Sequence, residues 1–547
     1  MSSRRGRLSR WLQTRALAGF APGPYDVTVQ RKLRVPMDDG VELLADLYSP
    51  VGEVSPPLPA IVIRSPYGRR PFGVQAAALA REGFTVLIQS CRGTWGSGGQ
   101  FTPQVNEQAD GITTHRWVRK QPWCSGTVAT FGPSYLGYTQ WALAVEAGPE
   151  LKGMLTAVTA SAFRDPTYAG GSYSLATILN WATITTNLGG SALAFAYKQN
   201  RAQRRLRRAF SHLPLSEVDT MALGRPVPFF QEWLEHCEPD DPYWTERVCA
   251  DVSTVRAPVC MVGGWYDIFL PWQLRDYATL RGAGAQPRLV IGPWTHADPG
   301  LIPASVREGV SWFAAARNGG TTGGVSVHIG GIDEWRDLPS WPPHSRRTPW
   351  YLRPGMGLAP EPPTAPPGSE AAPDRFRYDP ADPTPSPGGA LLTTEAGPKD
   401  NRVVERRPDI LVYSGEELAE DLEAIGPVTA TIRVRTSGEH FDVHVRLCDV
   451  HPDGRSVNLT DGIRRVCPGE APPDSDGVRA VEVELWPIGH VFKRGHRLRV
   501  HVAGGAHPRS ARNPGTGEPL GSATALRTVD FEVYHDAAHP SALHLPA

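Results

Sequence analysis

The segment at 132–137, Gly-Pro-Ser-Tyr-Leu-Gly, constrains the fold more than any other. It follows an apolar run at 127–131 that is typical of a buried strand, and it precedes a helix-like run at 138–145. A serine in this strand–turn–helix setting is a relative of the nucleophile elbow, spaced G-x-S-x-x-G rather than G-x-S-x-G. The sharp turn lifts the hydroxyl clear of the sheet, and the small residues let neighbouring elements pack around it. We therefore predict that Ser134 is a nucleophile.

The sequence around this serine alternates between strand-like and helix-like runs. Apolar runs lie at 60–64, 84–89, 128–131, 154–159, 258–263 and 288–291, and helix-like stretches lie at 74–82 and 108–120. This alternation predicts a parallel sheet covered by helices on both faces. Between 159 and 258 the gap is several times longer than a crossover connection requires. Because it is rich in aromatic residues and has a helical stretch at 193–213, we predict a helical cap over the carboxyl edge of the sheet.

The character of the chain changes after Trp341. The range 352–400 is rich in Pro, Gly and Ala and is predicted to be largely loop. Alternating runs with β-branched residues follow at 428–436, 441–447, 478–485, 497–502 and 528–534, which indicates a β-sandwich. The predicted domains are a basic tail at 1–24, an α/β core at 25–164 and 249–345, a helical cap at 165–248, and a β-sandwich at 346–547.

A serine nucleophile requires a histidine base and an acid that orients it. In this architecture they follow the serine in the order acid, histidine, each at the end of a later strand. The run at 258–263 leads to Asp267, and the run at 288–291 leads to His296. The other histidines lack this combination of position and order, among them His115, His328 and His344. We predict a triad of Ser134, His296 and Asp267.

Acyl transfer also requires donors for the oxyanion of the tetrahedral intermediate. The main-chain N–H of Tyr135, directly after the nucleophile, is the first expected donor. The second should come from the loop after an early strand, at 61–68. Because Pro66 has no N–H, the side chain of Tyr67 is a candidate.

Six motifs together resemble the cocaine-esterase (CocE/NonD) hydrolases, which are relatives of the X-Pro dipeptidyl-peptidases. They are Arg-Ser-Pro-Tyr-Gly at 64–68, Cys-Arg-Gly-x-x-x-Ser-x-Gly at 91–99, Gln-Pro-Trp-Cys at 121–124, the segment at 132–137, Gly-Trp-Tyr-Asp at 264–267 and Gly-Pro-Trp-x-His at 292–296. The resemblance extends from about Val27 to the C-terminus. It implies an α/β-hydrolase core, an inserted helical cap and a C-terminal jelly roll. It also implies an oxyanion hole made by the Tyr67 hydroxyl and the Tyr135 N–H, and a structural role for Arg92 and Ser97.

These observations predict a serine carboxylic ester hydrolase that works through an acyl-enzyme, with amides as further substrates left open. No metal or cofactor is expected. Four aromatic residues are candidates for an apolar substrate pocket, although core packing would explain each of them equally well. They are Trp181, Trp265, Phe269 and Trp272. The resemblance supports only Phe269, because it lies beside the acid.

Three other functions share parts of this pattern. A dipeptidyl-peptidase or an α-amino-acid ester hydrolase would bind an ammonium group, for which paired carboxylates are suited. Glu146 and Asp165 are the only acidic residues that we place near the strand ends, and they form no evident cluster. An acyltransferase that excludes water would use the same acyl-enzyme, and the sequence does not separate it from a hydrolase. A carbohydrate-binding protein with a vestigial triad is disfavoured by the complete triad and its tyrosine.

Net charge and cysteine content limit which partners and which cellular compartment the sequence predicts. Basic and acidic residues balance at 56 each, which gives no electrostatic argument for nucleic acid or an anionic membrane. The arginine run at 204–208 is therefore interpreted as a solvated helix face. Seven cysteines without C-x-x-C spacing argue against disulfides and structural zinc and favour a reducing cytosol.

The N-terminus has a twin arginine, but Gln13 and Arg15 interrupt the apolar stretch that an export signal requires. No run approaches the roughly 18 apolar residues of a membrane span. We predict a cytoplasmic enzyme with a small-molecule ester or amide substrate and neither a nucleic-acid nor a membrane partner. The oligomeric state is left open.

Overall fold

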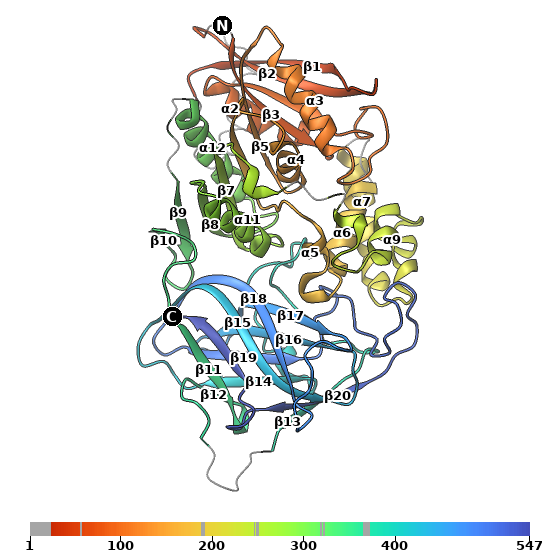
Figure 1. The fold of residues 1–547 in the computed structure, drawn as a ribbon, viewed down its shortest axis with the longest axis vertical. Coiled ribbons are helices and arrows are strands. Elements are labelled where there is room, and N and C mark those ends of the chain that lie inside the picture. The colour runs from red at the N-terminus through yellow and green to blue at the C-terminus, as the bar shows by residue number, and fades with distance from the viewer. Residues whose placement is uncertain are drawn as a thin grey trace.

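The computed structural model describes residues 23–54, 57–186, 192–245, 247, 251–317, 320, 323–364 and 372–547. Within these residues the strands form two sheets, one ten-stranded and one eleven-stranded. Figure 1 shows the N-terminal sheet with its helices at the top, the C-terminal strands at the bottom, and a group of helices beside the space between them. The predicted basic tail lies outside the described residues up to position 22.

The N-terminal sheet is parallel in its centre. Its order is β1 (Asp26–Pro36), β2 (Glu42–Val51), β4 (Thr85–Ser90), β3 (Leu58–Ser65), β5 (Cys124–Pro133), β6 (Leu151–Ala157), β7 (Val259–Tyr266), β8 (Arg288–Thr295), β9 (Gly324–Ile329) and β10 (Glu334–Leu338). The strands from β4 to β9 in this order pair in parallel, and β1, β2 and β10 pair antiparallel at the two edges. All six predicted strand runs fall in this sheet. Strands β9 and β10 lie outside the predicted strand runs.

Helices cover both faces of this sheet, as the alternating pattern predicts. Helices α2 (Gly73–Arg81) and α12 (Leu301–Arg317) contact each other, and α3 (Glu107–Arg119) contacts α4 (Tyr135–Ala144). The first pair shares an apolar cluster with one side of the central strands. Helices α4 and α11 (Leu270–Gly282) belong to the cluster that continues into the inserted helices. The strand ends near α4 and α11 therefore lie under the insertion.

The insertion between β6 and β7 is helical, as predicted. It contains α5 (Arg164–Thr167), α6 (Leu175–Thr186), α7 (Ala192–Ala209), α8 (Val218–Leu223), α9 (Pro228–Glu235) and α10 (Pro242–Thr245). Aromatic side chains hold it together: the ring of Trp181 stacks on that of Trp233, with 5.8 Å between centroids, and contacts Phe229 at 4.8 Å. This aromatic packing fixes α6 and α9 as a cap beside the edge of the sheet (Figure 1).

The C-terminal strands form a mostly antiparallel sandwich. They are β11 (Arg347–Arg353), β12 (Gly357–Ala359), β13 (Asp374–Tyr378), β14 (Ile410–Gly415), β15 (Leu422–Thr436), β16 (Phe441–Val450), β17 (Ser456–Val466), β18 (Arg479–Phe492), β19 (Arg497–Ala503), β20 (Val529–Tyr534) and β21 (Ala542–Pro546). Alternate residues of these strands enclose a separate apolar core. The range 352–400, predicted to be mostly loop, contains the short strands β12 and β13.

The predicted fold class, an α/β-hydrolase core with an inserted helical cap and a C-terminal sandwich, is confirmed by this arrangement. The limits given for each domain stay a prediction. In the part of the chain that the structure describes, no helix combines the length and apolar character that crossing a membrane requires. Six of the seven cysteines are free thiols, and Cys249 lies outside the described residues.

Candidate active site

The turn between β5 and α4 holds Ser134 in a strained conformation. Its φ is 56° and its ψ is −131°, a region that residues with a side chain rarely adopt. The two glycines of the motif permit the turn sterically. A Cβ on Gly132 would lie 2.5 Å from the Cβ of Leu136, and one on Gly137 would lie 2.3 Å from Thr159 Cγ2. The backbone geometry is therefore that of a nucleophile elbow, with the Ser134 side chain at the helix start.

Ser134, His296 and Asp267 form a continuous chain of hydrogen bonds. His296 follows β8, and its Nε2 lies 2.9 Å from Ser134 Oγ. The other ring nitrogen, Nδ1, lies 2.6 Å from Asp267 Oδ2. Asp267 is fully buried, and its Oδ1 accepts a hydrogen bond of 2.8 Å from the main-chain N–H of Phe269. With a neutral imidazole, Nδ1–H donates to Asp267 and Nε2 accepts from the serine, the arrangement that general-base catalysis requires.

The alternative histidines lie elsewhere. His115 is buried on α3, and burial lowers its pKa to about 4. His328 Nε2 hydrogen-bonds Asp333 at 2.7 Å, and His344 is exposed. None of the three lines the cavity described below.

Two candidate oxyanion donors lie beside the serine. Burial raises the pKa of Tyr67 to about 12, while contacts with Trp181 and Ser134 oppose that effect, so the phenol stays protonated. Trp181 Nε1–H donates to the Tyr67 hydroxyl at 2.9 Å, which orients it. Tyr135 is the first residue of α4, a position whose main-chain N–H has no acceptor within the helix. Its own hydroxyl donates to Glu107, 3.0 Å away, so its side chain is occupied elsewhere.

Ser134 and His296 open into a cavity of about 640 Å³. Of the four aromatic candidates, Trp181, Phe269 and Trp272 line it. Trp265 does not, which corrects its predicted placement. Trp265 lies in β7, and its side chain points away from the cavity. Its indole N–H donates to the carbonyl of His328 at 2.6 Å, and its ring packs against Gly489 and Trp341.

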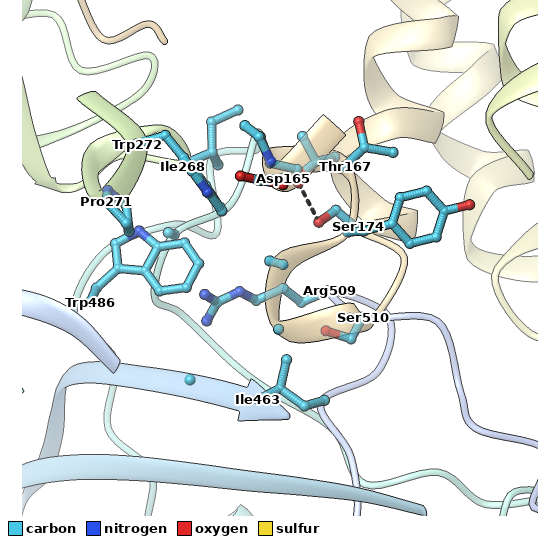
Figure 2. A pocket seen from close by; sticks show the side chains of 18 of the residues that line it. Asp165, Thr167, Ser174, Ile268, Pro271, Trp272, Ile463, Trp486, Arg509 and Ser510 are labelled. Atoms are coloured by element: carbon cyan, nitrogen blue, oxygen red, sulfur yellow. Dashed lines mark hydrogen bonds between the residues drawn. The ribbon is translucent and has the colours of Figure 1, made fainter. Parts of the chain in front are cut away.

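The core, the cap and the sandwich each contribute a wall to the cavity. The residues of the sandwich wall were not predicted from the sequence. Figure 2 shows Asp165 and Thr167 from the cap, Ile268 and Trp272 from the core, and Ile463, Trp486, Arg509 and Ser510 from the sandwich. Trp486 also holds the main chain at Asp267, because its Nε1–H donates to the carbonyl of Asp267 at 3.0 Å. No local sequence signal marks these sandwich residues, since only the folded chain brings them to Ser134.

The two acidic residues considered for ammonium binding are separated. Glu146 accepts a hydrogen bond from Gln108 at 2.8 Å and does not line the cavity. Asp165 lines it but is paired with Arg275 at 2.5 Å and lies 3.7 Å from Arg164. These two residues therefore provide no free pair of carboxylates for an ammonium group.

Within the part of the chain that the structure describes, side chains of metal-ligating types gather at three places, all in the sandwich. The groups are Glu405, Cys448 and His501; Asp449, His451 and His496; and Asp474, Asp476 and His539. Among the described residues, none of these groups includes a cavity residue. Their carboxylates already pair with neighbouring cations or imidazoles, such as Asp449 with His490 at 3.1 Å.

Comparison with known proteins gives concordant matches over nearly the whole chain. The family model "X-Pro dipeptidyl-peptidase (S15 family)" matches residues 39–298, and "X-Pro dipeptidyl-peptidase C-terminal non-catalytic domain" matches residues 312–544. A cocaine esterase from Rhodococcus sp. (strain MB1 Bresler) is 32% identical, with 95% of this chain and 98% of that protein covered.

Solved structures match at the level of the fold. An aminopeptidase from a marine sediment archaeon, Thaumarchaeota archaeon, has a TM-score of 0.81 at 22% identity, covering 96% of this chain and 97% of its own. An α-amino acid ester hydrolase has a TM-score of 0.77 at 22% identity, with the same coverage. Both extend over the core, the cap and the sandwich.

Proposed function

Because this chain belongs to the serine hydrolase family of the cocaine-esterase (CocE/NonD) enzymes and the X-Pro dipeptidyl-peptidases, and is an ester hydrolase, we propose that it cleaves carboxylic esters through an acyl-enzyme on Ser134. The observation that carries the proposal is the hydrogen-bond chain from Ser134 through His296 to the buried Asp267, at the end of a cavity. Membership of the family supports chemistry of the acyl-transfer class, and this geometry supports these residues for its steps.

The proposed reaction has two halves. Ser134 Oγ attacks the ester carbonyl while its proton passes to His296 Nε2, and Asp267 stabilises the resulting imidazolium. The Tyr67 hydroxyl and the Tyr135 N–H donate to the oxyanion. When the C–O bond breaks, His296 gives the proton to the departing alcohol, leaving Ser134 acylated. Water, deprotonated by His296, then attacks the acyl-enzyme, and Ser134 leaves with the proton to release the acid.

The pairing of Asp165 favours hydrolysis of simple esters over a peptidase reaction. A dipeptidyl-peptidase or an α-amino-acid ester hydrolase must compensate a substrate ammonium. Asp165, the cavity carboxylate that we considered for this role, is already compensated by Arg275 and Arg164. A substrate with a free α-amino group therefore gains no unpaired partner from Asp165.

A substrate panel tests this proposal. We expect a neutral 4-nitrophenyl ester to exceed its matched 4-nitroanilide in kcat/KM, and a free α-amino group to bring no gain. A Gly-Pro 4-nitroanilide cleaved faster than the simple esters would overturn the assignment in favour of a dipeptidyl-peptidase. Product analysis with added alcohols distinguishes an acyltransferase, which would form the new ester in preference to the free acid.

The variant Tyr67→Phe tests the oxyanion hole. It keeps the aromatic ring but removes the hydroxyl, and losing one oxyanion donor costs about 2.7–4 kcal/mol, or roughly a hundred- to a thousandfold in kcat. We expect a loss in kcat of this size with KM nearly unchanged, measured by steady-state kinetics.

Tyr135→Phe is the matched control, because it removes a hydroxyl bonded to Glu107 but keeps the main-chain N–H. It should lose far less kcat than Tyr67→Phe. A loss below about threefold for Tyr67→Phe in a normally folded protein would assign the second donor to the main chain instead.

A further inference from the structure

Arg509, which follows β19, lies in the wall of the cavity formed by the sandwich. Its side chain is 12% exposed. Figure 2 shows its guanidinium reaching toward Trp486, with Ile463 below and the cap above. The guanidinium carbon lies 4.6 Å from the centre of the Trp486 ring, so the cation rests against an aromatic face.

Arg509 shares its counter-ion with a second arginine. Asp461, whose side chain is 3% exposed, pairs with Arg509 and also with the fully buried Arg446, at 2.7 Å. Two guanidiniums therefore face one carboxylate, which leaves an excess positive charge at this wall. Burial, together with the like charge of Arg446, lowers the pKa of Arg509. An anion at this place would reduce the cost of keeping the cation buried.

The two arginines differ in their hydrogen bonds. Every side-chain nitrogen of Arg446 has an acceptor. Nε and Nη2 donate to Asp461, Nη2 also donates to Ser386 at 2.6 Å, and Nη1 donates to Asn401 at 2.6 Å. Arg509 uses Nη1 alone, for Asp461. Among the described residues, Nε and Nη2 of Arg509 have no acceptor. These two nitrogens share one edge of the guanidinium, and their parallel N–H groups match a carboxylate that binds with both oxygens.

A second buried polar group lies at the same wall without a partner. His444 lines the cavity, its side chain is 7% exposed, and its Nε2 has no hydrogen-bond partner among the described residues. It lies 3.9 Å from Asp461 Oδ2, beyond hydrogen-bond distance. Burial and the nearby Arg446 lower its pKa well below the ordinary value, so the ring is neutral. A neutral imidazole can donate one hydrogen bond to a bound anion.

We propose that the free edge of Arg509 binds a carboxylate of the substrate. The enzyme then acts on esters that carry a free carboxylate away from the ester bond that it cleaves. The inference rests on the proposed ester hydrolysis and names its substrate class. Apolar side chains also line the cavity: the Phe269 ring lies 5.6 Å from that of His296, and the Trp272 ring lies 5.6 Å from that of Trp486, which Arg509 contacts. They suit an apolar linker between the ester and the carboxylate.

The other charged side chains that line the cavity are paired or exposed, so Arg509 remains available to a carboxylate of the substrate. Asp165 is compensated by Arg275, and Arg464 pairs with Glu470 at 2.8 Å. Glu482 and Glu484 also line the cavity, at exposed positions of β18 where water screens them. The buried charge without a full counter-ion is therefore positive.

The test compares 4-nitrophenyl monoesters of glutaric, adipic and pimelic acid with the same esters whose distal carboxyl is methylated. We expect the free acid to be preferred in kcat/KM at the chain length that spans the cavity. Arg509→Gln should lower kcat/KM for that acid about ten- to a hundredfold and change the methylated ester less than about threefold. Arg509→Lys should retain part of the preference, since it keeps the charge without the fork.

Arg464→Gln is the matched control, because it removes the same charge from a cavity residue whose guanidinium faces Glu470. It should leave the preference for the acid unchanged. Equal losses on both esters in Arg509→Gln would show that Arg509 only supports Trp486. The absence of a preference for the acid at every chain length would also overturn the proposal.

A binding measurement separates this inference from the proposed function. Monomethyl adipate should bind to the Ser134→Ala protein, measured by calorimetry, and binding should be lost when Arg509→Gln is added. Failure of the proposed function would appear instead as missing hydrolysis of the methylated esters, with this binding intact. If the two proteins bind the carboxylate equally, Arg509 is not its site.

Discussion

Ser134→Ala is expected to lower kcat for a good ester substrate by about a millionfold and to abolish covalent labelling by a fluorophosphonate. The size follows from the proposed mechanism, in which the acyl-enzyme forms on Ser134 Oγ and the variant has no atom to take its place. Binding and the oxyanion donors remain, so a residual rate above that of water alone is expected. Steady-state kinetics and mass spectrometry of the labelled protein measure the two effects.

The fold should tolerate this change. The Ser134 hydroxyl contacts His296 and Tyr67 in the cavity, so its removal leaves the apolar core intact. Ser174→Ala is the control: Ser174 lines the same cavity, but its hydroxyl donates to the carbonyl of Pro166 at 2.7 Å. It should be labelled like the unchanged protein. Full labelling of Ser134→Ala would mean that the nucleophile lies elsewhere.

His296→Ala is expected to reduce kcat nearly as far, again by about a millionfold. Without the imidazole, no base removes the serine proton and no acid protonates the leaving alcohol. Members of a triad act as a unit, so the double variant Ser134→Ala with His296→Ala should be no slower than either single variant. A rate for the double variant that equals the product of the two separate losses would contradict coupling between these residues.

His115→Ala is the control for the base. It removes another buried histidine, but one on α3 that does not line the cavity. A thermal melt accounts for any loss of stability, after which kcat of the folded fraction should be close to that of the unchanged protein. Equal damage from His115→Ala at unchanged stability would place the assignment of His296 in doubt.

The hydrogen-bonded arrangement of Ser134, His296 and Asp267 could be predicted because each of the three residues has a local signal. Ser134 lies in a glycine-framed turn, and Asp267 and His296 each follow an apolar strand. Parallel strands bring their carboxyl ends to one edge of the sheet, so three strand-end residues in the right order converge without knowledge of the rest of the fold. The structure places them within hydrogen-bond distance of one another.

The cavity could not be predicted to the same extent. Trp265 and Phe269 lie four residues apart beside the acid, yet Trp265 in β7 packs against Gly489, whereas Phe269, directly before α11, lines the cavity. Trp486 and Arg509 belong to the sandwich, and their neighbours in sequence carry no sign of the distant serine. Which face of a strand meets another domain is decided by packing between domains, and a single sequence gives no register for that contact.

The hydrogen bond from Trp486 to the carbonyl of Asp267 also affects how the enzyme can be engineered. The sandwich provides both a wall of the cavity and a support for the loop that carries Asp267. Exchanging it for the sandwich of another hydrolase would alter selectivity and turnover in the same step. A chimera that keeps the host chemistry must therefore retain an indole at position 486, whatever changes are made to the residues around it.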